Sequence, residues 1–406
     1  MRITFLTGHL AKERHMLLYE LALDLSAHGA FVTVITGFPS RRITNETRQY
    51  YLDHPIEKIN DNLIIKRVGS RKGEGKGLFQ RYVRYLKLSK RIKKEALKTP
   101  TDCFYIYSSP PFLGYHSKAL SKVAPVVYNA QDIFPDSLFF VKPFVKKTPL
   151  KWFFESKEKK VYKYCDSIIT ISEAMKATIA QRCDDVNKIK VIYNWSDFNA
   201  LKNVERKDNR LFQERNIPTD KFIVSYGGDV GMFQNWDVII DSFKKLEDVA
   251  NLVVFGNGTK LDYVRNRIKN ENISNIFLLP MQPKNRVSEV YSLGDLELVP
   301  LAQGLSGFAL PSKLYNVFAC KKPVLAMLDK KSEYYNLINE NAFGFSIEPN
   351  NSDLLIKVVK DNINNLDLKT MGIKGFDYLK VECSRSTQTT KYFNCLLEAC
   401  IKHQTK

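Results

Sequence analysis

Runs of apolar residues alternate with segments of helical periodicity along the whole chain. Near the amino terminus, an apolar run at 3–7 is followed by leucines spaced for a helix between 17 and 25, and then by a second run at 31–36. This alternation predicts parallel β-strands joined by helices that cover both faces of a sheet. We therefore expect an α/β protein.

The pattern continues as two series of strands separated by a polar segment. Residues 200–218 carry no sustained apolar period and indicate a linker. We expect one Rossmann-like, doubly wound domain over 1–205, a second over 206–385, and a helix over 386–406 that crosses back to the first. Two such domains facing one another predict a ligand cleft at the carboxyl ends of their strands. The remaining predicted strands are 63–68, 103–107, 126–129, 167–171, 189–193, 222–226, 252–255, 276–279, 296–299 and 324–326.

Length and composition exclude several other classes of protein. The 406 residues exceed what one hydrophobic core supports, and 44% hydrophobic with 26% charged residues excludes a disordered chain. The seven cysteines are widely spaced and contain no C-x-x-C pair, which argues against a disulfide framework and a structural zinc site. The first apolar run is too short for a signal peptide, and no run reaches 18 apolar residues. We expect a cytoplasmic protein without a membrane-spanning segment.

The net charge of +19 is concentrated in two segments of the first half. Residues 71–98 hold eleven basic and two acidic residues, and residues 142–163 hold eight basic and two acidic residues. Such clusters attract anionic surfaces, which include nucleic acid, anionic lipid and phosphorylated substrates. The charge therefore directs attention to an anionic partner of the first domain.

Glycines gather after two strands of the second half. Gly228 and Gly231 follow the strand at 222–226 and precede a helix that begins near 235, and Gly256 and Gly258 follow the next strand. Glycines at such a junction let backbone N–H groups approach a phosphate at a helix amino terminus. Simple turn geometry is the alternative explanation for each one. Two such segments in consecutive units favour a nucleotide site.

A second phosphate-binding feature lies further along the chain. Pro311, Ser312 and Lys313 stand at the predicted first turn of a helix, where free N–H groups point outward and the lysine adds a full positive charge. This arrangement suits a diphosphate. The alternative is an exposed lysine that merely begins a helix.

The order and spacing of several motifs resemble a known family. The chain is similar to glycosyltransferase family 4 enzymes of the GT-B fold, in the branch of the L-fucosamine transferases of O-antigen and capsule assembly. The resemblance covers most of the chain. Its motifs are Ser108-Ser109-Pro110-Pro111-Phe112, Asn129-Ala130-Gln131-Asp132, Val191-Ile192-Tyr193-Asn194-Trp195, Tyr226-Gly227-Gly228-Asp229, Val253-Val254-Phe255-Gly256-Asn257-Gly258, Gly294-Asp295-Leu296-Glu297, and Leu310-Pro311-Ser312-Lys313-Leu314-Tyr315-Asn316.

The resemblance implies that the second domain holds a nucleotide-activated sugar, with UDP as the expected nucleotide. The base would lie beside Gln282, and the diphosphate between the first glycines and Lys313. Many members carry two glutamates eight positions apart, where this chain has Phe308 and Asn316. Asn316 and Glu333 are therefore the two candidates for the ribose contact.

Neither a cofactor nor a metal is expected. Asp295 and Glu297 superficially resemble a pair of metal ligands, but they open a predicted buried strand, and the resembling family works without a metal. Breaking a sugar–nucleotide bond leaves a diphosphate with growing negative charge, so the main task of the protein is electrostatic. Lys313 suits that task.

The resemblance further implies retention of the anomeric configuration. In front-face attack the leaving phosphate accepts the proton of the acceptor, so no enzyme base is required. Asp132, after the strand at 126–129, is the best carboxylate for the acceptor side, and a helix N-cap is its alternative role. Gly8 and His9, in the first turn after a strand, are also assigned to the acceptor side, with a donor contact or no functional role as the alternatives for His9.

The basic segments suggest where the acceptor comes from. Apolar and basic residues recur at spacings of three and four between 78 and 98, and Thr148-Pro149 begins a second helix with aromatic residues at 152–154. Such helices can lie at an anionic interface, or their apolar stripes can pack on the sheet while the lysines face solvent. We favour a protein bound peripherally to the inner face of the cytoplasmic membrane, with a polyprenyl-diphosphate-linked or saccharide acceptor.

The sequence thus predicts a retaining glycosyltransferase of surface polysaccharide biosynthesis, for which an N-acetylated deoxyhexosamine is one candidate sugar. A GT-B nucleotide-sugar epimerase is the first alternative. A basic nucleic-acid-binding protein is the second, but no base-reading module is recognised and the second domain would have no role. We expect no nucleic acid among the partners.

Overall fold

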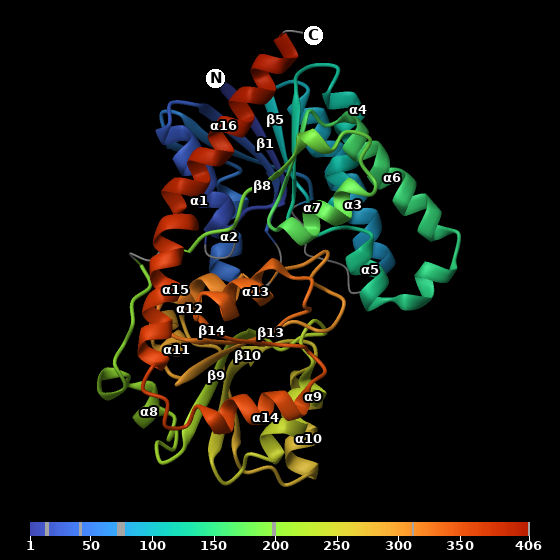
Figure 1. The fold of residues 1–406 in the computed structure, drawn as a ribbon. Coiled ribbons are helices and arrows are strands. Elements are labelled where there is room, and N and C mark those ends of the chain that lie inside the picture. The colour runs from blue at the N-terminus through green and yellow to red at the C-terminus, as the bar shows by residue number, and fades with distance from the viewer. Residues whose placement is uncertain (13–15, 40–42, 71–77, 197–199, 311, 405–406) are drawn as a thin grey trace. The chain divides into compact units, whose positions relative to one another are not determined.

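The computed structural model describes residues 1–12, 16–39, 43–70, 78–196, 200–310 and 312–404. The chain forms two compact units (Figure 1): Met1–Tyr193 together with Gln388–Lys406, and Asn194–Thr387. The units divide directly after the first series of strands, twelve residues before the division between 205 and 206 that the pattern predicted. The last helix belongs mainly to the amino-terminal unit.

The amino-terminal unit is built on an eight-stranded sheet of order β3-β4-β2-β1-β5-β6-β7-β8. Every pair of neighbours is parallel except β3 and β4. The strand order reverses between β1 and β5, and such a reversal is where doubly wound sheets bind ligands. The strands are β1 (Arg2–His9), β2 (Phe31–Gly37), β3 (Ile56–Asn60), β4 (Leu63–Val68), β5 (Cys103–Tyr107), β6 (Val126–Ala130), β7 (Ser167–Thr170) and β8 (Ile189–Val191).

Helices cover both faces of this sheet, and Figure 1 shows α1 on one side and α3, α4 and α6 on the other. The apolar stripe of α3 packs on the strands, because Leu88, Ile92 and Ala96 are buried and the helix contacts β1 and β2. The helices are α1 (Met16–Ala27), α2 (Asn45–Asp53), α3 (Leu78–Ala96), η1 (Pro111–His116), α4 (Ser117–Leu120), α5 (Asp136–Val141), η2 (Pro143–Lys147), α6 (Leu150–Tyr164), α7 (Glu173–Ala180) and η3 (Val186–Lys188).

β3 was not predicted, and its side chains explain why. Glu57 points inward and pairs with Arg67 of β4, with both side chains buried, whereas Ile56 is 63% exposed. A buried ion pair therefore occupies the face that the apolar pattern would have marked as core. Thr148, expected to cap α6, instead donates its hydroxyl to the carbonyl of Val145 at 2.8 Å.

The carboxy-terminal unit holds an all-parallel six-stranded sheet of order β11-β10-β9-β12-β13-β14. Its order reverses between β9 and β12, so the switch point lies at the carboxyl ends of these two strands. The strands are β9 (Phe222–Asp229), β10 (Ala250–Asn257), β11 (Ile276–Leu279), β12 (Leu296–Pro300), β13 (Val324–Met327) and β14 (Gly344–Ile347).

A large core between this sheet and α9, α10 and α14 holds the unit together. Figure 1 shows these three helices on one side of the sheet and α12, α13 and α15 on the other. The helices are η4 (Arg206–Asp208), α8 (Leu211–Glu214), α9 (Trp236–Lys244), α10 (Leu261–Asn270), η5 (Lys284–Arg286), α11 (Val287–Tyr291), α12 (Lys313–Ala319), α13 (Glu333–Glu340), α14 (Ser352–Asp361), α15 (Leu368–Glu382) and α16 (Arg385–Gln404).

Two expectations for this unit need correction. The glycine segments after 226 and 255 begin as strand and not as turn, because β9 continues to Asp229 and β10 to Asn257, and these ends pair with each other. The segment expected as a linker also packs on the unit, because Leu211, Phe212 and Ile217 are buried against β9 and β10. The apolar residues of this segment are few and irregularly spaced, so the sequence pattern did not predict that it packs on the sheet.

α16 returns the chain to the amino-terminal sheet. The Tyr392 hydroxyl accepts a hydrogen bond from the Asn129 amide of β6 at 3.1 Å, and Cys395 lies 3.2 Å from the Ser167 hydroxyl of β7. All seven cysteines are free thiols, and all except Cys400 are buried. Within the described ranges, no helix has both the length and the hydropathy of a membrane-spanning segment.

Candidate active site

The candidate donor site lies at the switch point of the carboxy-terminal sheet. Gly228 is near the carboxyl end of β9, and α12, the helix that follows the neighbouring strand β12, begins at Lys313. Since ligands of doubly wound sheets bind where the strand order reverses, both residues stand where a ligand is expected.

Gly228 and Lys313 are in close contact. A Cβ atom placed on Gly228 would lie 2.6 Å from the ammonium nitrogen of Lys313, and the φ angle of Gly228 is +144°, which favours glycine. The missing side chain lets the lysine approach the main chain at the end of β9. Lys313 is half-buried and reaches toward the strand, so it is not the exposed lysine of the alternative interpretation.

Tyr226 contacts the Lys313 ammonium through both its hydroxyl and its ring. The Lys313 ammonium donates to the Tyr226 hydroxyl and lies 3.9 Å from the centroid of its ring, while that hydroxyl donates to the Asp229 carbonyl at 2.5 Å. Burial lowers the pKa of Lys313 to about 7, and the negative charge of Asp229 opposes this shift. An anion that binds here will raise the pKa again, so the site gains positive charge when the anion arrives.

The predicted amide donor at Gly231 is already engaged. The Gly231 N–H donates to the side-chain oxygen of Gln234 at 2.9 Å, one turn before α9 begins at Trp236. A phosphate at this amide would have to displace Gln234. The Gly231 amide therefore has a local role in the structure, in which it binds the side chain of Gln234.

Gly256 and Gly258 are explained by packing. A Cβ atom on Gly256 would lie 2.6 Å from the Gly228 carbonyl oxygen, and one on Gly258 would lie 2.7 Å from the Val230 amide nitrogen. Both glycines thus allow the end of β10 to pack against the segment that carries Gly228. Their assignment to the donor remains a prediction.

Helices α12 and α13 bring the other predicted donor residues near one another. The hydroxyls of Tyr315 on α12 and Tyr334 on α13 are 2.9 Å apart, so the Glu333 end of α13 lies beside the first turns of α12. Asn316 accepts a hydrogen bond from the Ser196 hydroxyl at 2.9 Å. Ser312 is exposed and does not cap α12, and Pro311 lies outside the described residues.

Gln282 lies further from this group. It follows β11, which is separated from β9 by β10, and its amide donates to the Pro280 carbonyl at 2.8 Å. Neighbouring strands are about 4.8 Å apart, so a ligand joining Gln282 to Lys313 would extend over the end of β10.

In the amino-terminal unit, Gly8 and His9 close strand β1 at its switch point. The Gly8 N–H donates to the Ser109 carbonyl at 3.2 Å, and a Cβ atom on Gly8 would collide with the Pro110 ring. His9 lies 3.4 Å from the Tyr85 hydroxyl of α3. Glycine is therefore needed where the segment after β5 approaches β1, and His9 faces α3.

Asp132 stands at the same edge of that sheet, two residues after β6. Asp132 is exposed. The N–H of its neighbour Gln131 donates to the Ser108 hydroxyl at 3.1 Å, which anchors the backbone beside it. α5 begins at Asp136 with Pro135 before it, so Asp132 is not the N-cap of that helix. The position leaves the carboxylate available to a ligand.

Two tyrosines at the donor site were not predicted. Tyr226 holds Lys313, and Tyr291 of α11 donates to the Gly227 carbonyl at 3.2 Å. Sequence reasoning counted Tyr226 as an apolar strand residue. A tyrosine at the end of a buried run and directly before Gly-Gly was the available signal, because a buried hydroxyl requires a polar partner.

The acidic pair after Gly294 is used internally. Asp295 accepts from the Arg206 guanidinium at 2.8 Å, and buried Glu297 accepts from the Ser225 hydroxyl and from the Gly294 N–H at 3.1 Å. Burial raises the pKa of Glu297 to about 7. In the part of the chain that the structure describes, no three His, Cys, Asp or Glu side chains group as metal ligands.

Two curated relatives of this chain are named as glycosyltransferases. The probable glycosyltransferase WbjE of Pseudomonas aeruginosa is 24% identical over 323 residues, which cover 79% of this chain and 78% of that protein. The putative colanic acid biosynthesis glycosyl transferase WcaI of Escherichia coli K12 is 24% identical over 156 residues, 38% of each chain.

Solved structures agree on the fold. Anabaena HepE, determined in complex with UDP and glucose, superimposes with a TM-score of 0.70 at 15% identity, over 98% of this chain and 100% of that chain. Family models match both halves: Glycosyltransferase Family 4 over residues 15–199 and Glycosyl transferases group 1 over residues 207–373. The two sheets at whose carboxyl edges Asp132 and Lys313 stand are therefore those of a GT-B glycosyltransferase, with a family 4 domain followed by a group 1 domain.

Proposed function

We propose that the protein transfers a sugar from a UDP-sugar to a lipid-linked acceptor in surface polysaccharide biosynthesis, with retention of configuration. The observation that carries this proposal is the Lys313 ammonium held against Gly228 at the switch point of the carboxy-terminal sheet. HepE has UDP and glucose bound, and the name of WcaI refers to colanic acid, which supports the nucleotide and the class of product. An N-acetylated deoxyhexosamine remains our candidate sugar.

The chemistry follows from the charge that the reaction creates. As the bond between the sugar and UDP breaks, negative charge grows on the leaving diphosphate and positive charge on the sugar. The Lys313 ammonium stabilises the diphosphate. Burial lowers the pKa of Lys313 to about 7 in the free protein, and the bound diphosphate raises that pKa, so the lysine is protonated when the anion is bound. In front-face attack the leaving phosphate takes the proton of the acceptor hydroxyl, so Asp132 would orient that hydroxyl rather than act as an obligatory base.

An exposed aromatic surface supports a peripheral position on the inner face of the cytoplasmic membrane. Phe144 and Trp152 are 63% and 72% exposed, while their sequence neighbours Val145 and Phe154 are buried in a small core. Exposed lysines at 146, 147, 159 and 160 accompany them. Aromatic rings beside lysines suit the boundary of an anionic membrane.

Binding of UDP tests the donor site. Replacing Lys313→Met removes a charge-assisted contact worth about 1.5–3 kcal/mol, so UDP affinity should fall roughly 10- to 100-fold by isothermal titration calorimetry. Lys357→Met, on the exposed side of α14, makes the same change of charge and should leave affinity unchanged. Equal affinities of the two variants would reject the proposed donor site.

Turnover distinguishes transfer from epimerisation. Release of UDP from a UDP-sugar should depend on an added lipid-linked acceptor, and Asp132→Asn should lower that rate without weakening UDP binding. Conversion of the donor to an isomer without an acceptor would instead favour the epimerase.

Sedimentation with vesicles tests the membrane surface. Phe144→Ser together with Trp152→Ser should reduce binding to vesicles containing phosphatidylglycerol, because both side chains leave water on binding. Val186→Ser, at a 51% exposed apolar residue of η3, is the matched control. Binding that does not depend on anionic lipid would contradict the proposal.

A further inference from the structure

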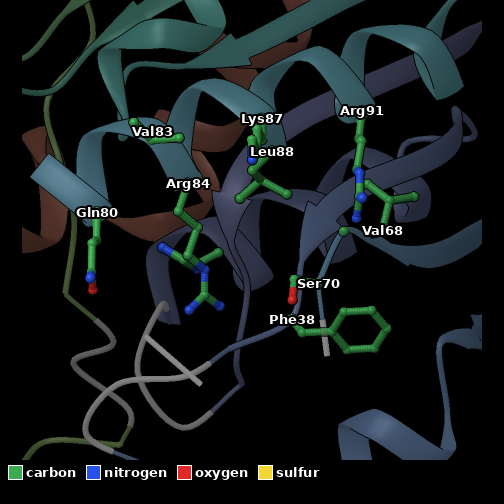
Figure 2. A pocket seen from close by; sticks show the side chains of 11 residues that line it. Phe38, Val68, Ser70, Gln80, Val83, Arg84, Lys87, Leu88 and Arg91 are labelled. Carbon is green, nitrogen blue, oxygen red and sulfur yellow. The ribbon is translucent and has the colours of Figure 1, made fainter. Parts of the chain in front are cut away.

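A pocket of about 350 Å³ opens in the amino-terminal unit between α3 and the carboxyl ends of β1, β2 and β4. Figure 2 shows Arg84 and Arg91 projecting from α3 to the side on which Phe38 and Ser70 lie. His9, the last residue of β1, also lines the pocket. The pocket therefore stands at the same edge of the sheet as the predicted acceptor residues.

Leu88 is the residue through which α3 packs closely on the strand ends beside this pocket. Leu88 is buried against two glycines, since Cβ atoms on Gly37 and Gly69 would lie 2.8 and 2.9 Å from its methyl groups. The φ angle of Gly69 is +108°, a conformation that favours glycine. Together with buried Ile92 and Ala96, this contact holds α3 against the strands that border the pocket.

The wall of the pocket is mainly apolar. Phe38, which is buried, Val68 and Val83 contribute side chains to it together with Leu88. No carboxylate is among the described residues that line it. A hydrocarbon chain fits this apolar part of the lining. The polar side chains of the lining are those of His9, Ser70, Gln80, Arg84, Lys87 and Arg91.

Positive charge is gathered on one side of the same pocket. Arg84, Lys87 and Arg91 line it at helical spacings of three and four, which place them on one face of α3. The Nη1 atom of Arg84 is buried and has no hydrogen-bond partner among the described residues. A buried guanidinium nitrogen without an acceptor is costly, so an anion that supplies oxygen atoms is the natural complement.

We propose that this pocket binds the diphosphate and the first isoprene units of a polyprenyl-diphosphate-linked acceptor. The inference rests on the proposed function, because it assigns a site to the acceptor of that reaction. Ligand pockets usually measure roughly 300–1,000 Å³, so this one takes the head of the lipid and the beginning of its chain. Its residues differ from those that hold the donor.

The strand order leads from this pocket to Asp132. β1 ends at the pocket and β6 ends before Asp132, with only β5 between them. Strands lie about 4.8 Å apart, so the two ends are roughly 10 Å from each other. A sugar attached to the diphosphate in the pocket would therefore extend toward Asp132.

Direct binding of farnesyl diphosphate, below its micelle concentration, tests the site without any donor. We expect Arg84→Gln and Lys87→Gln each to weaken binding at least tenfold by isothermal titration calorimetry. Lys90→Gln makes the same change at an exposed residue of α3 that does not line the pocket, and should change affinity less than twofold. Circular dichroism melting curves confirm that each variant is folded, and Lys87, which is exposed, provides a test that does not disturb the core.

Three further ligands complete the test. Inorganic pyrophosphate and farnesol should each bind at least tenfold more weakly than farnesyl diphosphate, because each lacks one half of the ligand. Dihexanoyl phosphatidylglycerol should also bind more weakly and without sensitivity to Arg84→Gln. The proposal is overturned if Arg84→Gln and Lys90→Gln behave alike, or if pyrophosphate or the phospholipid matches farnesyl diphosphate.

The outcome is separable from that of the proposed function. Lys313→Met should lose UDP affinity while it retains farnesyl diphosphate affinity, since the two sites lie in different units. Loss of UDP binding in Lys313→Met with no effect of Arg84→Gln on farnesyl diphosphate would reject the pocket and keep the donor site. The reverse result would reject the donor site and keep the pocket.

Discussion

Lys313 has lost much of its water, and no carboxylate of the described residues forms an ion pair with it. Among the described residues, the Tyr226 hydroxyl is its hydrogen-bond acceptor, and burial lowers the pKa of Lys313 to about 7. The free protein therefore holds a lysine that is partly neutral near physiological pH. A diphosphate supplies the missing negative charge, so ligand binding and protonation are linked at this residue.

This linkage predicts how UDP affinity depends on pH. A bound diphosphate returns the pKa of Lys313 toward its usual value of about 10.5, so above pH 7 each binding event takes up a proton. UDP affinity should then fall roughly tenfold for each unit of pH above 7. Calorimetry in two buffers of different ionisation enthalpy measures the proton directly.

Lys313→Arg is the control for that experiment, because arginine stays protonated throughout this range. Its UDP affinity should be flat between pH 7 and 9. A wild-type affinity that is equally flat would show that the lysine is already fully charged in the free protein.

Gly228→Ala should disturb the same lysine by steric means. The new methyl group would occupy the space of the Lys313 ammonium, and the φ angle of +144° adds strain of about 1–3 kcal/mol. We expect UDP affinity to fall at least about tenfold. Gly304→Ala separates the two effects, since Gly304 has a φ angle of +83° and nothing within 4 Å of its Cβ position. It should lose stability and keep its affinity for UDP.

Among the elements, β9 and β12 meet at a buried polar contact. Glu297 of β12 lies opposite Ser225 of β9 and is almost entirely excluded from solvent. Because burial raises the pKa of Glu297 to about 7, the carboxyl is protonated in the folded protein over a range in which the unfolded chain is ionised. Folding then takes up a proton, and stability declines as the pH rises from about 4.5 to 7.

Glu297→Gln should remove that decline. The difference in free energy of unfolding between the variant and the wild type should grow in favour of the variant by about 3 kcal/mol between pH 4.5 and 7. Urea unfolding at several pH values measures it. Asp353→Asn, at an exposed acid of α14, should show no comparable trend, and a constant difference for Glu297→Gln would contradict the assignment.

The elements also show how far the sequence could lead. Buried parallel strands are continuous apolar runs, so most strands of both sheets were predicted at nearly their observed bounds. β3 was not predicted because its inward side chain is Glu57, and β14 was not predicted because Gly344 and Ser346 interrupt its apolar run. The family resemblance placed Gly228 and Lys313 on one diphosphate, but their direct contact joins segments 85 residues apart and could not be derived from local sequence patterns.

At the scale of the whole molecule, α16 completes the amino-terminal unit. Buried Tyr392 and Cys395 of this helix contact a sheet whose strands all precede residue 192. The Asn129 amide depends on Tyr392 for one of its hydrogen bonds. The carboxy-terminal unit is thus an insertion between two parts of the other unit.

Removing residues 388–406 should therefore destabilise the amino-terminal unit alone. We expect differential scanning calorimetry to show an early transition for that unit, while UDP binding by the other unit persists. Deletion of residues 404–406 is the control and should leave both transitions in place. A single unchanged melting profile after the longer deletion would show that the helix is dispensable.

This threading of the chain has a consequence for biosynthesis. The ribosome synthesises the whole carboxy-terminal unit before it synthesises α16, which the amino-terminal unit needs. The amino-terminal sheet therefore exposes the apolar surface that α16 covers until α16 has been made. Nascent chains stalled near residue 387 should accordingly bind chaperones through their amino-terminal unit, because that unit is complete only after α16 has been synthesised.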